Sequence, residues 1–187
     1  MKNSLGIVYQ EESSECALAC LTMIFNYHGG NSSLSKLRMR FPIPIDGISV
    51  RNLSSISGEL GFDVVVLKSD LEGLKLFKEP VLIHFDMQHF VTLKEYRNGY
   101  FTVYDPARGI RKLSEKTLSN HFTGILLKLT PNEGFKPLND KKDIGLLDVI
   151  GNFRQYLKPI GVVFVVSLIL EMLLLMQPII FRKTIDS

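Results

Sequence analysis

A glutamine and a cysteine near the start of the chain have the types and spacing that covalent hydrolysis of an amide requires. Gln10 lies six residues before Cys16, and Cys16 opens a run of apolar residues with helical spacing. A thiol at a helix N-terminus lies close to unpaired N–H groups and to the positive end of the helix dipole, and both favour the nucleophilic thiolate. The side-chain amide of Gln10 and the backbone N–H of Cys16 could together stabilise an oxyanion.

A cysteine nucleophile also needs a base and a group that orients the base. His89 opens one predicted strand, and Asp105 directly follows another, before Pro106. A histidine can take the thiol proton, and a carboxylate can fix the tautomer of the ring and stabilise its charged form. We therefore predict a catalytic set of Cys16, His89 and Asp105, with Gln10 as a donor to the oxyanion. Each residue alone also fits a structural role, so the hypothesis depends on their combination.

The second thiol, the other histidines and one acid near the nucleophile fit structural roles. Cys20 lies one turn inside the first helix, where a core position is expected. His84 falls within an apolar strand, His28 lies at a helix end, and His121 is expected to pack against its neighbours. Glu15 directly precedes the nucleophile; it either raises the thiol pKa by like-charge repulsion or faces solvent, and both alternatives stay open. No cluster has metal-ligand spacing, so we expect no metal or other cofactor at this site.

Helices precede strands along the chain. Predicted helices span residues 16–28, 34–41, 49–60, 70–77 and 114–122, and predicted strands span residues 62–68, 81–85, 89–96, 100–104 and 124–129. Ser13 or Ser14 is expected to cap the first helix, and Asn98-Gly99 is expected to form a hairpin turn. The continuous apolar run within 62–68 is typical of a strand buried on both faces. This order predicts an α+β fold with helices packed on an antiparallel sheet.

The C-terminal part differs in composition from the first 130 residues, which we expect to form one domain. Residues 131–158 are assigned as a linker and juxtamembrane segment, 159–181 as a transmembrane helix, and 182–187 as a tail. About 20 apolar residues suffice to cross a bilayer. Glu171 falls inside the apolar run, and a carboxylate at that depth usually faces protein or water. More Lys and Arg precede the run than follow it, which predicts a cytoplasmic N-terminal domain.

Charge and cysteine content exclude several classes of protein. The net charge is only +3 and no dense basic run occurs, so nucleic acid is a poor candidate partner. The two cysteines form no CxxC pair and are poorly placed for a disulfide if both lie on one helix. The first four residues lead into no apolar segment of a secretory signal, so we expect the catalytic domain to lie in a reducing cytosol.

At the residues described above, the sequence resembles the N-terminal papain-like peptidase domain of bacteriocin-processing ABC transporters, and most closely the colicin V and microcin exporters. The resemblance covers roughly the first 130 residues and then continues into the apolar run that resembles the first membrane helix of such a transporter. The matching features are Gln10, the run from Glu15 to Leu21, Met23-Ile24, Tyr27 with Gly29, His89-Phe90-Val91, Asp105-Pro106 and His121-Phe122-Thr123-Gly124.

This resemblance implies a papain-like fold and a cysteine endopeptidase that removes the leader of a bacteriocin or microcin precursor after a double-glycine motif, coupled to export. Two glycines can pass a narrow cleft that excludes side chains, and a leader helix would bind an apolar groove through spaced anchors. The resemblance further implies that the protein is located in the bacterial inner membrane. The partners it implies are the precursor peptide, a second copy of the chain bound through the transporter, and further envelope export components.

The ATP that such transporters use would bind outside this chain, because the chain contains no GxxxxGK[ST] phosphate loop. We therefore expect the chain to be the N-terminal part of a longer exporter, or a truncated version of one. Two alternatives remain open. The first is a leader-docking domain without catalysis, which the presence of Cys16, His89 and Asp105 disfavours. The second is a membrane-tethered cysteine hydrolase that acts on a small amide or thioester.

Overall fold

The computed structural model describes residues 4–137 and 160–173, which belong to two separate compact units, Met1–Asp140 and Lys141–Ser187. The helical elements of the first unit are the 3-10 turn η1 (Ser13–Glu15) and the helices α1 (Cys16–Tyr27), α2 (Leu34–Arg40), α3 (Val50–Glu59), α4 (Leu71–Leu74) and α5 (Glu115–His121). Its strands are β1 (Phe62–Lys68), β2 (Val81–Phe85), β3 (His89–Arg97), β4 (Tyr100–Asp105), β5 (Gly109–Ser114) and β6 (Phe122–Pro131).

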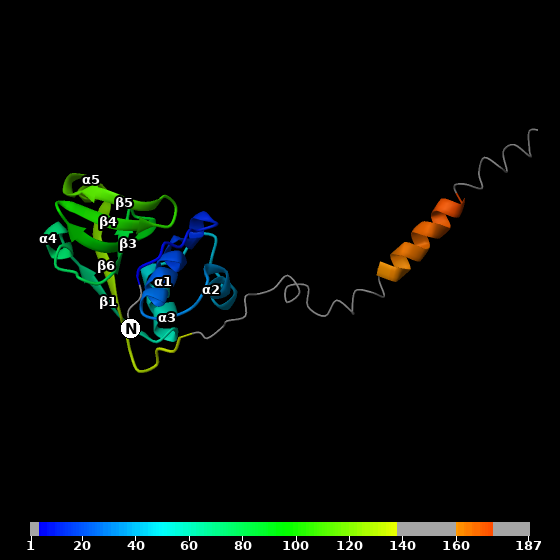
Figure 1. The fold of residues 1–187 in the computed structure, drawn as a ribbon, viewed down its shortest axis with the longest axis horizontal. Coiled ribbons are helices and arrows are strands. Elements are labelled where there is room, and N and C mark those ends of the chain that lie inside the picture. Colours follow the sequence, from blue (N-terminus) through cyan, green and yellow to red (C-terminus); the bar gives the residue numbers. More distant parts are fainter. Residues whose placement is uncertain (1–3, 138–159, 174–187) are drawn as a thin grey trace, which may run out of the picture. The chain divides into compact units, whose positions relative to one another are not determined.

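The six strands form one sheet in the order β1-β6-β2-β3-β4-β5, and every neighbouring pair is antiparallel. Helices α1, α2 and α3 gather at one side of this sheet, and α4 lies away from them (Figure 1). The predicted α+β class with an antiparallel sheet is confirmed. The predicted hairpin between β3 and β4 is confirmed as well, because Asn98 and Gly99 both have the positive φ values, 52° and 81°, that a tight hairpin turn requires.

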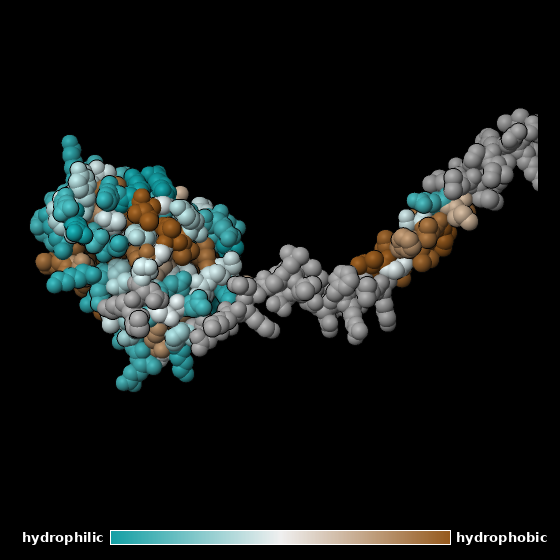
Figure 2. Space-filling view, in the orientation of Figure 1, coloured by the Kyte–Doolittle hydropathy of each residue, from teal (hydrophilic) through white to brown (hydrophobic). Residues whose placement is uncertain are grey.

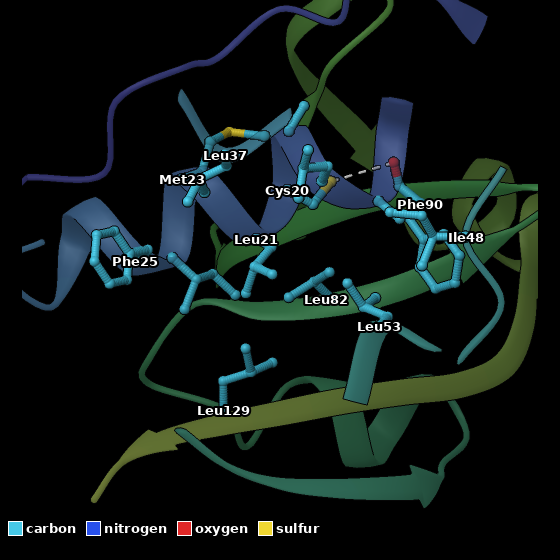
Figure 3. Packing of buried hydrophobic residues seen from close by; sticks show 14 of the residues in the cluster. Cys20, Leu21, Met23, Phe25, Leu37, Ile48, Leu53, Leu82, Phe90 and Leu129 are labelled. Atoms are coloured by element: carbon cyan, nitrogen blue, oxygen red, sulfur yellow. Dashed lines mark hydrogen bonds between the residues drawn. The ribbon is translucent and has the colours of Figure 1, made fainter. Parts of the chain in front are cut away.

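Two hydrophobic cores cover the two faces of the sheet, because successive strand residues point to opposite faces. Leu82 and Phe90 pack with α1, α2 and α3 in the larger core. Ile83 and Val91, the next residue on each of these strands, pack in the second core, which also holds Leu74 of α4 and Leu118 of α5. Figure 3 shows the larger core, with side chains of α1 enclosed between other helices and the sheet. Helix α1 is therefore fixed along its length.

Serine side chains start three of the helices as local sequence predicts. Ser33, Ser49 and Ser114 each accept a hydrogen bond from the backbone N–H three residues ahead, at the starts of α2, α3 and α5. The first helix is different, and the predicted cap by Ser13 or Ser14 is wrong. Those serines lie within η1, which runs directly into α1, and the N-cap position of α1 is taken by Glu15.

Strand β1 has the predicted bounds but not the predicted burial. Among the described strands it lies at an edge of the sheet and pairs with β6 alone. Val65 and Val66 are 49% and 48% exposed, so the expectation of a strand buried on both faces is wrong. An unbroken run of apolar residues indicates that the segment favours an extended backbone. Whether both faces of the strand are buried depends on which other elements cover them.

Strand β5 and the length of α4 were not predicted correctly. Strand β5 carries Arg111 and Lys112 on an edge of the sheet, where charged residues are common because they discourage pairing with another chain. Because of these charges, the sequence lacks the alternation of apolar and polar residues by which a strand is recognised. Helix α4 covers only four of the eight residues predicted as helix, with Asp70 as its N-cap.

The chain continues to pack against the first unit beyond the end of β6. Asn132 donates its backbone N–H to the carbonyl of Gly61 at 2.9 Å. The ring of Phe135 lies 5.4 Å from the ring of Phe25 and 5.1 Å from that of Phe62. Apolar contact therefore extends a few residues past position 130, where the sequence suggested the domain would end.

Residues 160–173 are helical, and their side chains are mostly hydrophobic (Figure 2). In the ranges that the structure describes, no helix combines the length and the apolar character needed to span a bilayer. The span predicted for 159–181 extends past this helix at both ends, and those ends, like residues 138–158 and 182–187, lie outside the described residues.

Candidate active site

The nucleophile candidate is held at the junction of η1 and α1. Helix α1 packs against β3 in the larger core, and the Cys20 thiol donates a hydrogen bond to the carbonyl oxygen of Phe90 at 3.3 Å (Figure 3). One turn before Cys20, Cys16 is therefore brought to the start of β3, where His89 lies. The structure places these two residues, which are 73 positions apart, beside one another, so that the Cys16 thiol contributes to the pKa of the His89 ring.

The predicted base and its orienting carboxylate also meet. Strands β3 and β4 are antiparallel neighbours, so the start of β3 and the end of β4 lie at the same edge. His89 Nε2 lies 2.9 Å from Asp105 Oδ1. The same carboxylate oxygen accepts the Ala107 backbone N–H at 2.9 Å, while Oδ2 lies 3.6 Å from Arg111. Asp105 is thus buried, anchored by its own turn and directed at the ring.

The pKa values of the pair move in opposite directions. Burial lowers the pKa of His89, but hydrogen bonds to Asp105 and Cys16 outweigh burial and raise the pKa to about 9. Burial raises the pKa of Asp105, but the hydrogen bonds from His89 and the Ala107 N–H, with the nearby Arg111 charge, bring it below its usual range. Near neutral pH the pair is therefore an imidazolium and a carboxylate, and the imidazolium faces the Cys16 side chain.

Gln10 is tied to the turn that follows Asp105. Its backbone N–H donates to the carbonyl of Pro106 at 3.1 Å, and its side chain lines a cavity of about 250 Å³ together with His89 and Asp105. Its buried Oε1 atom has no hydrogen-bond partner among the described residues. The two ends of a glutamine amide are assigned from their partners. No hydrogen bond of Oε1 to the described residues therefore fixes which end of this amide faces the cavity.

A second and larger cavity, of about 600 Å³, opens beside the thiol. Ser13 lines both cavities, Cys16 lines the larger one, and His89 lines the smaller one. The thiol and the imidazole therefore stand where the two cavities approach each other. A peptide chain running from one cavity into the other would pass between these two groups. The walls of the larger cavity include Ile45, Ile48, His84, Met87 and Phe90.

His84 is a part of the site that sequence reasoning missed. It was expected to be structural because it interrupts an apolar strand, but it lines the larger cavity with Cys16. Its Nδ1 atom lies 2.9 Å from the Thr123 hydroxyl. Burial lowers the pKa of His84, and the charge of nearby His89 lowers it further against a hydrogen bond to the Met87 backbone. The sequence feature that could have indicated this role is a polar residue within an otherwise apolar strand.

The other predicted structural residues lie as follows. Cys20 is fully buried, and burial raises its pKa well above the usual value, which confirms the expected core position. His28 is the C-cap of α1, as predicted. His121 stacks on Phe85 and contacts Asp86 through Nδ1 at 2.9 Å, so it fixes the turn before β3. In the described ranges no group of three or more His, Cys, Asp or Glu residues could hold a metal ion.

Two relatives match nearly the whole chain. It is 31% identical over 180 residues to the colicin V secretion/processing ATP-binding protein CvaB of Escherichia coli, and 31% identical over 185 residues to the probable microcin-H47 secretion/processing ATP-binding protein MchF of the same organism. The alignments cover 96% and 99% of this chain but 26% of each relative. The chain therefore spans about a quarter of the length of these relatives.

Solved structures show the same fold. A double glycine motif protease from an AMS/PCAT transporter, crystallised in complex with the leader peptide, has a TM-score of 0.64 and 29% identity, over 70% of this chain and 94% of that chain. The peptidase domain of Streptococcus ComA has a TM-score of 0.64 at 20% identity, over 68% and 99%. The model of the peptidase C39 family matches residues 4–134. This chain therefore belongs to the peptidase C39 family.

Proposed function

We propose that Cys16, His89 and Asp105 are the catalytic residues of a cysteine endopeptidase that removes a leader peptide after a double-glycine motif. The observation that carries the proposal is the meeting of thiol, imidazole and buried carboxylate, in which His89 Nε2 lies 2.9 Å from Asp105 Oδ1 and the pKa of His89 is raised to about 9. A structural relative that carries this fold, a double glycine motif protease, was crystallised with its leader peptide. That complex supports the substrate class proposed here.

The geometry supports a two-step acyl transfer. Asp105 holds Nε2 of His89, so Nδ1 is the ring nitrogen left for the thiol. The Cys16 thiolate attacks the scissile carbonyl carbon, and the Gln10 amide with the Cys16 N–H stabilises the oxyanion. The His89 imidazolium then gives its proton to the leaving amine, and a thioester forms. In the second step His89 takes a proton from water, and the hydroxide attacks the thioester carbonyl. The C–S bond breaks, the leader leaves as the free acid, and the Cys16 thiolate and His89 imidazolium are restored.

The two cavities take opposite sides of the cleaved bond. The acyl part stays attached to Cys16 after the first step, so the 600 Å³ cavity beside Cys16 receives the leader. The leaving amine takes its proton from His89, so the 250 Å³ cavity beside His89 receives the first residues of the mature peptide. Two glycines before the cleaved bond let the backbone approach a thiol that lies at a buried helix start without a clash of side chains.

We further propose that this domain acts within a longer exporter. Both Escherichia coli relatives are secretion/processing ATP-binding proteins, and each is about four times as long as the matched region. On this proposal ATP binds outside this chain, the C-terminal apolar run lies in the bacterial inner membrane, and the peptidase domain faces the cytoplasm. A second copy and further envelope components would complete the exporter.

A cleavage assay with the full chain tests this function. Synthetic peptides with a helical leader, a Gly-Gly pair and a short following segment are incubated with the protein, and the products are identified by mass spectrometry. We expect one cut, directly after the second glycine, and none when that glycine is replaced by valine. Leader binding without any cut would instead indicate a docking domain. Hydrolysis of a small thioester, with the leader peptide intact, would indicate the alternative hydrolase.

A further inference from the structure

A buried carboxylate beside the nucleophile has no part in the mechanism above. Glu15 directly precedes Cys16, and only 1% of its surface is exposed. Its Oε2 atom accepts the backbone N–H of Glu11 at 2.9 Å and that of Glu12 at 3.1 Å. These two amides immediately follow Gln10. The side chain of Glu15 therefore ties the segment that carries Gln10 back onto the start of the nucleophile helix.

An arginine from another helix neutralises this carboxylate. Arg38, on α2, places Nε at 2.5 Å from Oε1 of Glu15 and an outer nitrogen at 3.2 Å from Oε2. The same outer nitrogen lies 2.7 Å from the exposed carboxylate of Glu11. A buried charge is stable only when it is paired and hydrogen-bonded, and Glu15 meets both conditions. Its charge is thus directed at Arg38 and at two amides.

We propose that Glu15, supported by Arg38, is a positioning residue for the oxyanion site. The two donors of that site are the Gln10 amide and the Cys16 N–H, which lie at the two ends of the segment that Glu15 closes. An oxyanion site works only when its donors are held in place before the reaction, and a displacement of about 1 Å can cost roughly 10²-fold in rate. The inference rests on the proposed peptidase function and deepens it.

Removal of the charge with little change of shape is the direct test. Glu15→Gln keeps one acceptor oxygen for the two amides, but it removes the charge that pairs with Arg38 and sets an NH2 group against Arg38 Nε, which is also a donor, so the closure of the segment is weakened. In the full chain we expect kcat to fall between about 10-fold and 10²-fold, with KM changed less than about 2-fold. Arg38→Met should act in the same direction and more weakly. Glu115→Gln is the matched control, because it removes an ion-paired carboxylate remote from the site, and its kinetics should equal those of the wild type.

A second measurement separates positioning of the oxyanion site from a general structural role. Iodoacetamide alkylates Cys16 by displacement of iodide and forms no oxyanion, so its rate should stay within about 2-fold in Glu15→Gln. A leader peptide that ends in a glycine aldehyde adds the thiolate to its carbonyl and does form one, so its inhibition constant should rise with the loss of kcat. A parallel fall in alkylation, or an unchanged aldehyde constant, would overturn the inference.

The outcomes remain separable from failure of the proposed function. If Cys16→Ala still cleaves the leader, the peptidase assignment itself is wrong. If Cys16→Ala is inactive while Glu15→Gln keeps the wild-type kcat, only the positioning role is wrong. If Glu15→Gln fails to fold, the same measurements are made on Arg38→Met and Arg38→Lys. Wild-type kcat and wild-type aldehyde binding in both variants would contradict the inference.

Discussion

Two thiols one turn apart on α1 show how strongly local environment sets the chemistry of a side chain. Cys20 is enclosed in the larger core and donates to a strand carbonyl, and burial raises its pKa well above the usual value. Cys16 lines a cavity and meets an imidazole that Asp105 keeps charged near neutral pH. The same functional group is therefore inert at one position and suited to attack at the other.

Replacement of each thiol tests this difference. Cys16→Ala should abolish leader cleavage, because no other described thiol contacts His89, and should leave leader binding nearly intact. Cys20→Ala should keep most of the activity and lose about 1 kcal/mol of unfolding free energy from the lost packing. Cleavage rates and urea unfolding of the full chain measure both effects. An inactive Cys20→Ala protein beside a fully active Cys16→Ala protein would reverse the assignment.

The charge state of His89 can be measured directly. An NMR titration of the ring should give a pKa near 9 in the wild-type protein. Asp105→Asn can still hydrogen-bond the ring but cannot stabilise its charge, so the pKa should move toward the usual value of about 6.5. The alkylation rate of Cys16 at pH 7 should fall in the same variant. An unchanged His89 pKa would remove Asp105 from the catalytic set.

Stability should follow from the same shift, and its sign is fixed by linkage. Because the pKa of His89 is higher in the folded than in the unfolded state, the charged ring stabilises the fold fully below about pH 6.5, and this contribution is lost as the pH rises through about 9. Asp105→Asn should reduce this loss. Equal pH dependence of wild type and variant between pH 6 and 9, measured by urea unfolding, would show that the pair does not couple to folding.

At the scale of elements, the turn between β2 and β3 holds two residues with side chains in a left-handed backbone conformation. Asp86 and Met87 both have positive φ values, 47° and 62°, which side chains rarely adopt. His121 holds the turn twice, through its ring to the Asp86 carboxylate at 2.9 Å and through its carbonyl oxygen to the Asp86 N–H at 2.9 Å. Because β3 begins with His89 directly after this turn, the turn fixes the position of His89.

Relief of that strain should stabilise the domain. Met87 is 75% exposed, so its replacement by glycine loses little packing. The left-handed conformation costs about 1–2 kcal/mol in a residue with a Cβ, whereas glycine costs about 0.5–1 kcal/mol in unfolded-state entropy. Met87→Gly should therefore raise the unfolding free energy by up to about 1 kcal/mol, as measured by urea denaturation. Gln88→Gly, at the next position where φ is not positive, should be neutral or destabilising.

At the scale of the whole molecule, the chain has two units with different surfaces. The face of the first unit that Figure 2 shows is largely hydrophilic with one apolar patch, and residues 160–173 present large apolar side chains that are 47% to 69% exposed (Figure 2). Exposed apolar area on this scale indicates a contact with lipid or protein. If residues 159–181 form the predicted membrane span, the contact partner of these side chains is lipid.

Membrane association is therefore a prediction of its own. The full chain should sediment with membranes and resist extraction by carbonate, because apolar residues beyond both ends of 160–173 bring the run to the length that a bilayer needs. Replacement of Val165 and Leu168 by lysine should weaken this association, since each charge at that depth costs a few kcal/mol. A wild-type chain that stays soluble and monomeric without detergent would contradict the predicted span.

The sequence alone determined the parts of this protein that depend on neighbours along the chain. The spacing of apolar residues placed α1 and put Cys16 at its start, and the stretch from Gln10 to Cys16 brought two proposed oxyanion donors into one short segment. Asn98-Gly99 set the β3–β4 hairpin. These features follow from backbone preferences and local hydrogen bonds, which a short window of residues contains in full.

Only the tertiary structure decided which of these local pieces meet. His89 and Asp105 are hydrogen-bonded because the β3–β4 register brings the start of one strand beside the end of the other. Glu15 does not face solvent, one of the two alternatives that the sequence left open, because it is buried where α2 brings Arg38 to it. The same cause made β1 an exposed edge strand although its residues are apolar. Contacts between distant segments depend on the order of strands and on packing across the sheet, and no local pattern specifies either.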